Sequence, residues 1–67
     1  MSVAKVIEIS SSSSIGLEDA VQSGLNKCAE SIKSIQGAWI NDLKVVTDDK
    51  GKITEWRVHL HVTFVVA

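Results

Sequence analysis

The chain has 67 residues, a formal net charge of -1 and a single cysteine, Cys28. We expect one domain over residues 1–67, which is close to the lower size limit at which a single core can stabilise a fold. Because one cysteine cannot form a disulfide within the chain, we expect the protein to self-associate. The charge balance and scattered Lys and Arg argue against a nucleic-acid partner, and no apolar run or signal-peptide pattern indicates a membrane, so we expect a cytoplasmic protein.

The first segment is predicted to be a strand that leads into a helix. Residues 3–9, VAKVIEI, are rich in β-branched side chains, which favour a strand. The serine run Ser10 to Ser14 is expected to form a loop. Gly16 is then the predicted helix N-cap. A helix that starts there would have the negative charges of Glu18 and Asp19 in its first turn, where they complement the helix dipole.

The helix is predicted from one apolar stripe at helical spacing. The stripe comprises Leu17, Ala20, Val21, Gly24, Leu25, Cys28, Ile32 and Ile35. A helix with this spacing buries one face. Cys28 is therefore expected to be a buried, inert thiol, and Gly24, which costs ~1 kcal/mol relative to Ala, to allow close approach to the sheet. Gln36-Gly37 would end the helix through a glycine cap.

Two further strands complete the chain. Residues 38–47 are predicted as the second strand, and Asp48 to Gly51 as a hairpin turn with Gly51 at positive φ. The third strand, Ile53 to Val66, alternates strictly. Its even positions are apolar: Trp56, Val58, Leu60, Val62, Phe64 and Val66. Its odd positions are mostly polar: Glu55, Arg57, His59, His61 and Thr63. One face of this strand is therefore dry and the other wet.

These elements predict an α+β fold of the order strand, helix, strand, strand. The hairpin pairs the last two strands, and a wholly antiparallel sheet results if the first strand lies on the far side of the third, in the order 1-3-2. One helix then covers one face of the sheet and leaves the other bare. Neither face of the second strand is cleanly polar, which indicates that a partner subunit covers the second face.

The bare face carries the residues that could bind a ligand. Trp39 would share this face with Arg57 and His59 if the hairpin register holds. An aromatic plane, a guanidinium and an imidazole together can hold a flat, partly anionic molecule. The alternative is that Trp39 only packs in a subunit interface, with Arg57 in an ion pair to Glu55 or Asp42.

His59 and His61 lie on one strand face and could chelate a metal ion if a third ligand arrives from elsewhere, or from symmetric copies around an axis. Solvated or pore-lining histidines are the alternative.

We find no nucleophile with a base, no phosphate-binding glycine loop and no paired carboxylates, so we do not expect an enzyme.

The chain resembles the dodecin family over essentially its whole length. The resemblance rests on KVIEI followed by the serine run and EDAV, and on the terminal strand GKITEWRVHLHVTF. It implies a strand-helix-strand-strand subunit in a hollow homododecamer. It also implies flavins bound in pairs between tryptophans of two-fold related subunits, for storage and protection rather than catalysis.

Two positions depart from the flavin-binding pattern of that family. The stacking tryptophan of the family falls on Gly37, and Trp39 follows two residues later on the same strand face. The glutamine that contacts the flavin edge aligns with Arg57, which donates hydrogen bonds but cannot accept them. We therefore expect a non-enzymatic protein that stores riboflavin or FMN through Trp39, Arg57, Gly37 and His59. The alternative is a dodecin-like shell that binds no flavin, or that binds metal through His59 and His61.

Overall fold

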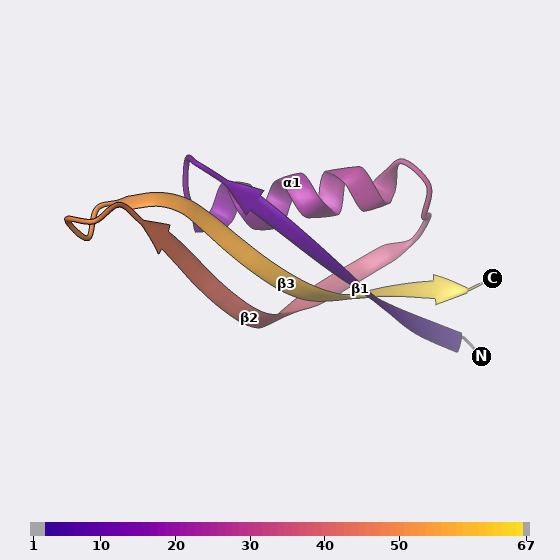
Figure 1. The fold of residues 1–67 in the computed structure, drawn as a ribbon. Helices are drawn as coiled ribbons and strands as arrows, with labels where there is room; N and C mark the ends of the chain where they lie inside the picture. The colour runs from indigo at the N-terminus through magenta and orange to yellow at the C-terminus, as the bar shows by residue number, and fades with distance from the viewer. Residues whose placement is uncertain (1–2, 67) are drawn as a thin grey trace.

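The protein was analysed as a computed structural model, which describes residues 3–66. The elements are β1 (Val3–Ser13), α1 (Leu17–Ala29), β2 (Ile35–Thr47) and β3 (Ile53–Val66). The strands form one antiparallel sheet in the order β1-β3-β2, so β3 is central and pairs with both others. Figure 1 shows α1 along one side of this sheet and the β2–β3 hairpin reaching past the end of β1. The predicted α+β class and the strand order 1-3-2 are confirmed.

The core lies where α1 packs on β1 and β3. Leu60 and Val62 are fully buried and Val58 is almost so, which confirms that the even positions of β3 form its dry face. From the helix, Ala20 and Cys28 complete the buried cluster. The thiol of Cys28 is free and buried, as its place in the apolar stripe predicted.

Gly24 allows the close approach of α1 to β1. A Cβ atom at this position would lie 3.0 Å from Cβ of Ser11 and 3.2 Å from Cδ1 of Ile9. Both separations are shorter than an ordinary van der Waals contact between carbon atoms, so a larger residue would press the helix away from the strand. The predicted reason for a glycine in mid-helix is confirmed.

The serine run is part of β1 as far as Ser13, so the prediction of a loop was wrong for Ser10 to Ser13 and right for Ser14. Residues 10–13 pair with β3, from Ser10 opposite His59 to Ser13 opposite Trp56. Their alternation has a structural use: Ser11 faces the helix, where only a small side chain fits beside Gly24, while Ser10 faces away. A low strand propensity is overridden here by pairing with the longest strand.

Ser13 closes β1 and prepares the start of α1. It is buried, its Oγ donates to Oδ2 of Asp19 at 2.6 Å, and the same oxygen accepts the backbone N–H of Ile15 at 2.9 Å. Gly16 occupies the N-cap with extended backbone and no side-chain cap, as predicted. Because Gly16 has no side-chain oxygen, Ser13 makes the side-chain hydrogen bonds at this junction instead.

The helix ends earlier than the apolar stripe predicted. It stops at Ala29, with Glu30 as C-cap, rather than at Gln36-Gly37. Ser34 then adopts a left-handed conformation at φ 61, and Ile35 opens β2 opposite Phe64. Gly37 is consequently a strand residue whose carbonyl accepts the hydroxyl of Thr63 at 3.1 Å. The predicted glycine cap was wrong because the helix ends at Glu30, well before Gly37, which pairs within β2 instead.

A β-bulge explains why β2 shows no clean alternation. The register shifts between Ile40 and Asp42, so Asn41 is an extra residue and the side-chain phase reverses there. Residues that share the helix side of the sheet are Ala38, Ile40, Leu43 and Val45, and those on the opposite side are Gly37, Trp39, Asp42, Lys44 and Val46. The turn that follows has Gly51 at φ 82, as predicted.

The helix leaves the apolar side chains of β2 open. Ile40 and Leu43 are about half exposed although they lie on the helix side, because α1 packs on β1 and β3. Trp39, on the opposite side, is 61% exposed. β2 therefore has exposed apolar side chains on both faces of the sheet. Within the described residues, no helix has the length and apolar character needed to cross a bilayer.

Candidate functional site

The candidate site is the face of the sheet that points away from α1, here called the outer face. Residues directly opposite each other in paired strands share a face, so the register places its members in rows across the three strands. From one end to the other the rows are Val6, Thr63 and Gly37; Glu8, His61 and Trp39; Ser10, His59 and Asp42; and Ser12, Arg57 and Lys44.

All four residues predicted to bind a flavin lie on this face, but not together. Trp39 is directly opposite His61, while Arg57 is opposite Lys44. Four residues of strand separate the rows of His61 and Arg57, which is roughly 13 Å at the usual rise. In the register Trp39 is therefore directly opposite His61, with Thr63 and His59 one row away on either side, and Arg57 belongs to a second part of the face.

That second part is an open groove. It has a volume of about 570 Å³ and is lined by Ser10, Ser11, Ser12, Asp42, Lys44, Glu55, Arg57, Val58 and His59. The volume lies within the range of small-molecule sites. The lining is polar and carries both signs of charge, and it does not include Trp39.

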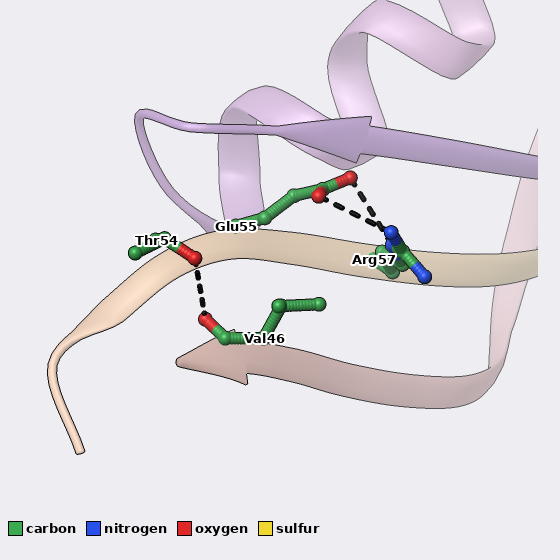
Figure 2. A network of polar contacts seen from close by, with 4 residues as sticks. All are labelled: Val46, Thr54, Glu55 and Arg57. Atoms are coloured by element: carbon green, nitrogen blue, oxygen red, sulfur yellow. Dashed lines mark hydrogen bonds and ion pairs between the residues drawn. The ribbon is translucent and has the colours of Figure 1, made fainter. Parts of the chain in front are cut away.

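Arg57 is held in the groove by Glu55. Its Nε donates to Oε1 of Glu55 at 3.1 Å and its Nη2 to Oε2 at 3.4 Å, a two-pronged ion pair shown in Figure 2. The hydrogen bond from Arg57, followed by one from Ser12, lowers the pKa of Glu55, and the same pair raises the pKa of Arg57. The expected alternative for Arg57, an ion pair to Glu55, is thus present. Guanidinium has further N–H groups that stay available to a ligand.

A hydrogen bond also joins the two strands of the β2–β3 hairpin next to the ion pair. Thr54 donates its hydroxyl to the carbonyl of Val46 at 3.1 Å, across the two strands (Figure 2). This bond satisfies a carbonyl near the end of β2, where the register shifts again between Val46 and Thr47. The strand carrying Glu55 and Arg57 is therefore locked to β2 on one side and to β1 on the other.

His59 and His61 meet a carboxylate from β1. The Nε2 atom of His61 lies 2.9 Å from Oε1 of Glu8, and Nε2 of His59 lies 3.6 Å from Oε2 of the same residue. The ring centroids are 5.8 Å apart, with the rings edge to face. Nδ1 of His59 is 3.1 Å from the hydroxyl of Ser10. The sequence predicted the pair of histidines but not Glu8 or Ser10.

The missing residues had a signal in the sequence. Glu8, Ser10 and Ser12 alternate with Ile7, Ile9 and Ser11, which is the period of a strand with one polar face. Ending the first strand at Ile9 hid this alternation. Lys44 was missed, and Asp42 was considered only as an ion-pair partner of Arg57, for a different reason: the bulge at Asn41 moves both residues onto the outer face, and no residue pattern predicts this bulge.

The structure defines a small α+β fold in which a helix covers one face of the sheet. The other face carries polar side chains and a groove large enough for a small molecule. The chain belongs to the dodecin family, whose family model matches residues 3–67. A comparison with curated proteins found no match.

Solved dodecin structures share this fold. A variant of the Thermus thermophilus dodecin superposes with a TM-score of 0.90 at 24% identity, over 100% of this chain and 98% of that one. The dodecin of Streptomyces davaonensis gives 0.88 at 21% identity, over 98% and 96%. The calcium dodecin of Mycobacterium tuberculosis gives 0.79 at 29% identity, over 97% and 91%.

Proposed function

We propose that this protein is a non-enzymatic flavin-binding and storage protein that works as a hollow homododecamer. The observation that carries the proposal is Trp39, which is 61% exposed on the outer face of a chain with few residues to spare for a core. A tryptophan left open beside two imidazoles is suited to stack on a flat heteroaromatic ring. Membership of the dodecin family supports flavin as that ring.

Gly37 has a role in this proposal that differs from that of a stacking residue. A Cβ atom at Gly37 would meet only Oγ1 of Thr63, at 4.0 Å, so the space over this position is open. Gly37 lies two residues from Trp39 on the same face. We propose that the ring lies over Gly37 and against Trp39, where a larger side chain would obstruct it.

The polar contacts to the flavin are proposed to come from two sources. His61, opposite Trp39, and His59, one row further, are placed to hydrogen-bond the polar edge of the ring. Arg57, roughly 13 Å away along β3 by strand rise, is placed to meet an anionic group further along the ligand, or a ligand held by a neighbouring copy. An arginine in this position suits the phosphate of FMN.

Self-association is supported by the apolar surface of β2. Ile40 and Leu43 on the helix side and Trp39 on the outer face are about half or more exposed in the isolated chain. A single chain of this size buries too little surface to be robust alone. Contact between copies along β2 would cover these side chains, and the cytoplasm is the proposed location of the assembly.

Titration of riboflavin and of FMN with the sized protein tests the flavin proposal. Stacking on Trp39 should quench flavin fluorescence strongly, and Trp39→Ala should weaken binding by about tenfold or more, since such stacking contributes up to ~1.5 kcal/mol beyond buried area. Trp56→Phe is the matched control, because Trp56 packs against the core on the opposite side of the sheet. Equal affinities for wild type and Trp39→Ala would remove Trp39 from the site.

A second candidate is a dodecin-like assembly that binds no flavin and serves as a shell or binds metal. Two observations favour it: Gly37 and Arg57 stand where flavin-binding members have their contacts, and the relative from Mycobacterium tuberculosis is described as a calcium-chelating dodecin. A dodecamer that leaves riboflavin and FMN fluorescence unchanged would support this candidate over flavin storage.

A further inference from the structure

Three side chains on the outer face converge on one point. Glu8, His59 and His61 each offer one ligand atom, and these atoms all lie within 4.8 Å of one another. Two β-strands supply them: Glu8 is directly opposite His61 in the β1–β3 register, and His59 is one outward-facing position further along β3. All three are accessible, with side chains 64%, 33% and 29% exposed for Glu8, His59 and His61.

The separations between these atoms suit a bound cation. Metal–ligand bonds of about 2.0–2.1 Å in a tetrahedral site put ligand atoms roughly 3.4 Å apart. The two oxygens of Glu8 lie 2.9 Å from Nε2 of His61 and 3.6 Å from Nε2 of His59, on either side of that value. The ligand atoms as a set lie within 4.8 Å of one another, so the three donors would draw together around a bound ion.

The second nitrogen of His59 is also held. Its Nδ1 contacts the hydroxyl of Ser10 at 3.1 Å, so the ring presents Nε2 toward Glu8. Histidines that bind metals usually have such an outer partner, which fixes the ring and the tautomer. A simple ion pair between Glu8 and His61 would need neither His59 nor this orientation of its ring.

We propose that Glu8, His59 and His61 form a binding site for a borderline divalent transition metal, with Zn²⁺ as the ion to test. Two imidazole nitrogens and one carboxylate are the ligands that such ions prefer, whereas Ca²⁺ takes six to eight oxygens. The site therefore differs in its chemistry from a calcium site. Three protein ligands leave a fourth position for water, a ligand atom or a residue of another copy.

This site shares His59 and His61 with the proposed flavin site, but metal binding and flavin binding can be measured separately. Trp39 lies opposite His61, so it is an intrinsic probe of an ion bound there. Cu²⁺ or Ni²⁺ at the site would quench Trp39 emission, while Trp56 lies on the core side of the sheet. Metal binding measured without flavin does not depend on the flavin proposal, and flavin binding by metal-free protein does not depend on this one.

The test is calorimetric titration of chelator-stripped, sized protein with Zn²⁺. We expect one ion per chain, weakened by more than about tenfold in Glu8→Gln, His59→Ala and His61→Ala alike, since even an outer partner of a ligand costs about 10–100-fold. Glu18→Gln, an exposed carboxylate change on α1, is the matched control and should bind as wild type does. Ca²⁺ should bind more weakly than Zn²⁺, and Co²⁺ should give the absorption of a four-coordinate site.

Three outcomes would overturn the proposal. Unchanged Zn²⁺ affinity in Glu8→Gln would leave only a pair of histidines and remove the site as described. One ion per three chains would place the metal on a symmetry axis instead of within the chain. Equal affinity for Ca²⁺ and Zn²⁺ would show that the imidazoles are not ligands. Size measurement of each variant distinguishes loss of metal binding from loss of assembly.

Discussion

Replacing Gly24 by alanine tests how closely α1 packs on β1. In an exposed helix this change stabilises by about 1 kcal/mol, because alanine has the better helix propensity. Here the new Cβ would lie 3.0 Å from Cβ of Ser11 and 3.2 Å from Cδ1 of Ile9. Ile9 can turn its flexible end away, but Cβ of Ser11 moves only with the strand backbone.

The magnitude follows from these two opposing effects. Overpacking a close contact typically costs about 1–3 kcal/mol, so subtracting the propensity gain leaves Gly24→Ala destabilised by up to about 2 kcal/mol. The assay is urea unfolding of both proteins at one fixed concentration, because assembly contributes to stability. A gain of about 1 kcal/mol in Gly24→Ala would refute the close approach, since that is the result for an uncrowded helix.

A double-variant cycle isolates the contact. Ser11→Gly removes the Cβ atom that the new methyl group at position 24 would meet, whatever that change costs by itself. In this background Gly24→Ala should be neutral or stabilising, so the two changes should couple favourably. Additive free energies would mean that Ser11 and Gly24 are not in contact.

Two further predictions concern the core and the groove. Leu60→Ala removes a fully buried side chain of β3 and should lower the free energy of unfolding by about 2–4 kcal/mol, and a loss below about 1 kcal/mol would mean that this face is not the core. Glu55 has a pKa below its ordinary value of 4.5 because Arg57, and secondarily Ser12, hydrogen-bond its carboxylate. The carboxylate therefore stabilises the fold at pH values above 4.5, and this contribution is lost as the pH falls through the lower pKa of the folded state. Glu55→Gln should therefore be less stable than wild type near neutral pH and lose that deficit in acid unfolding series, whereas a deficit that is the same at every pH would contradict the ion pair as its source.

Much of the fold could be predicted because β3 has a strict period of two. Its buried residues, Val58, Leu60 and Val62, all stand at even positions, and its odd positions form the outer face. The central place of β3 and the order 1-3-2 followed from this alternation. Gly51 marked the hairpin turn, and the helix stripe correctly included Cys28 and Gly24. These features depend on local pattern, which a sequence displays directly.

The errors came from tertiary effects that override local preference. Serine disfavours strands, yet residues 10–13 are held in β1 because each pairs with β3 and because Ser11 must be small beside Gly24. Ile32 and Ile35 continue the helical spacing after the helix has ended, since Ile35 packs against the core from β2 instead. The helix ends at Glu30 without a glycine, and the left-handed Ser34 lies beyond this cap, just before β2.

Only the part of the candidate site on β3 and on β2 near Trp39 could be predicted from the sequence. His59, His61 and Arg57 were placed on the outer face by alternation, but the bulge at Asn41 sets which residues of β2 join them. Glu8 was hidden because its contact with His61 spans 53 positions in the chain. Such pairings depend on register between strands, which composition does not reveal.

The most direct test of the account is native mass spectrometry of the protein after incubation with riboflavin. The account predicts the mass of a dodecamer of the 7.2 kDa chain with bound flavin, and it predicts that Trp39→Ala carries no flavin. A monomer, or a dodecamer that carries no flavin in the wild-type protein, would contradict the claim that the outer face is a flavin site completed by neighbouring copies.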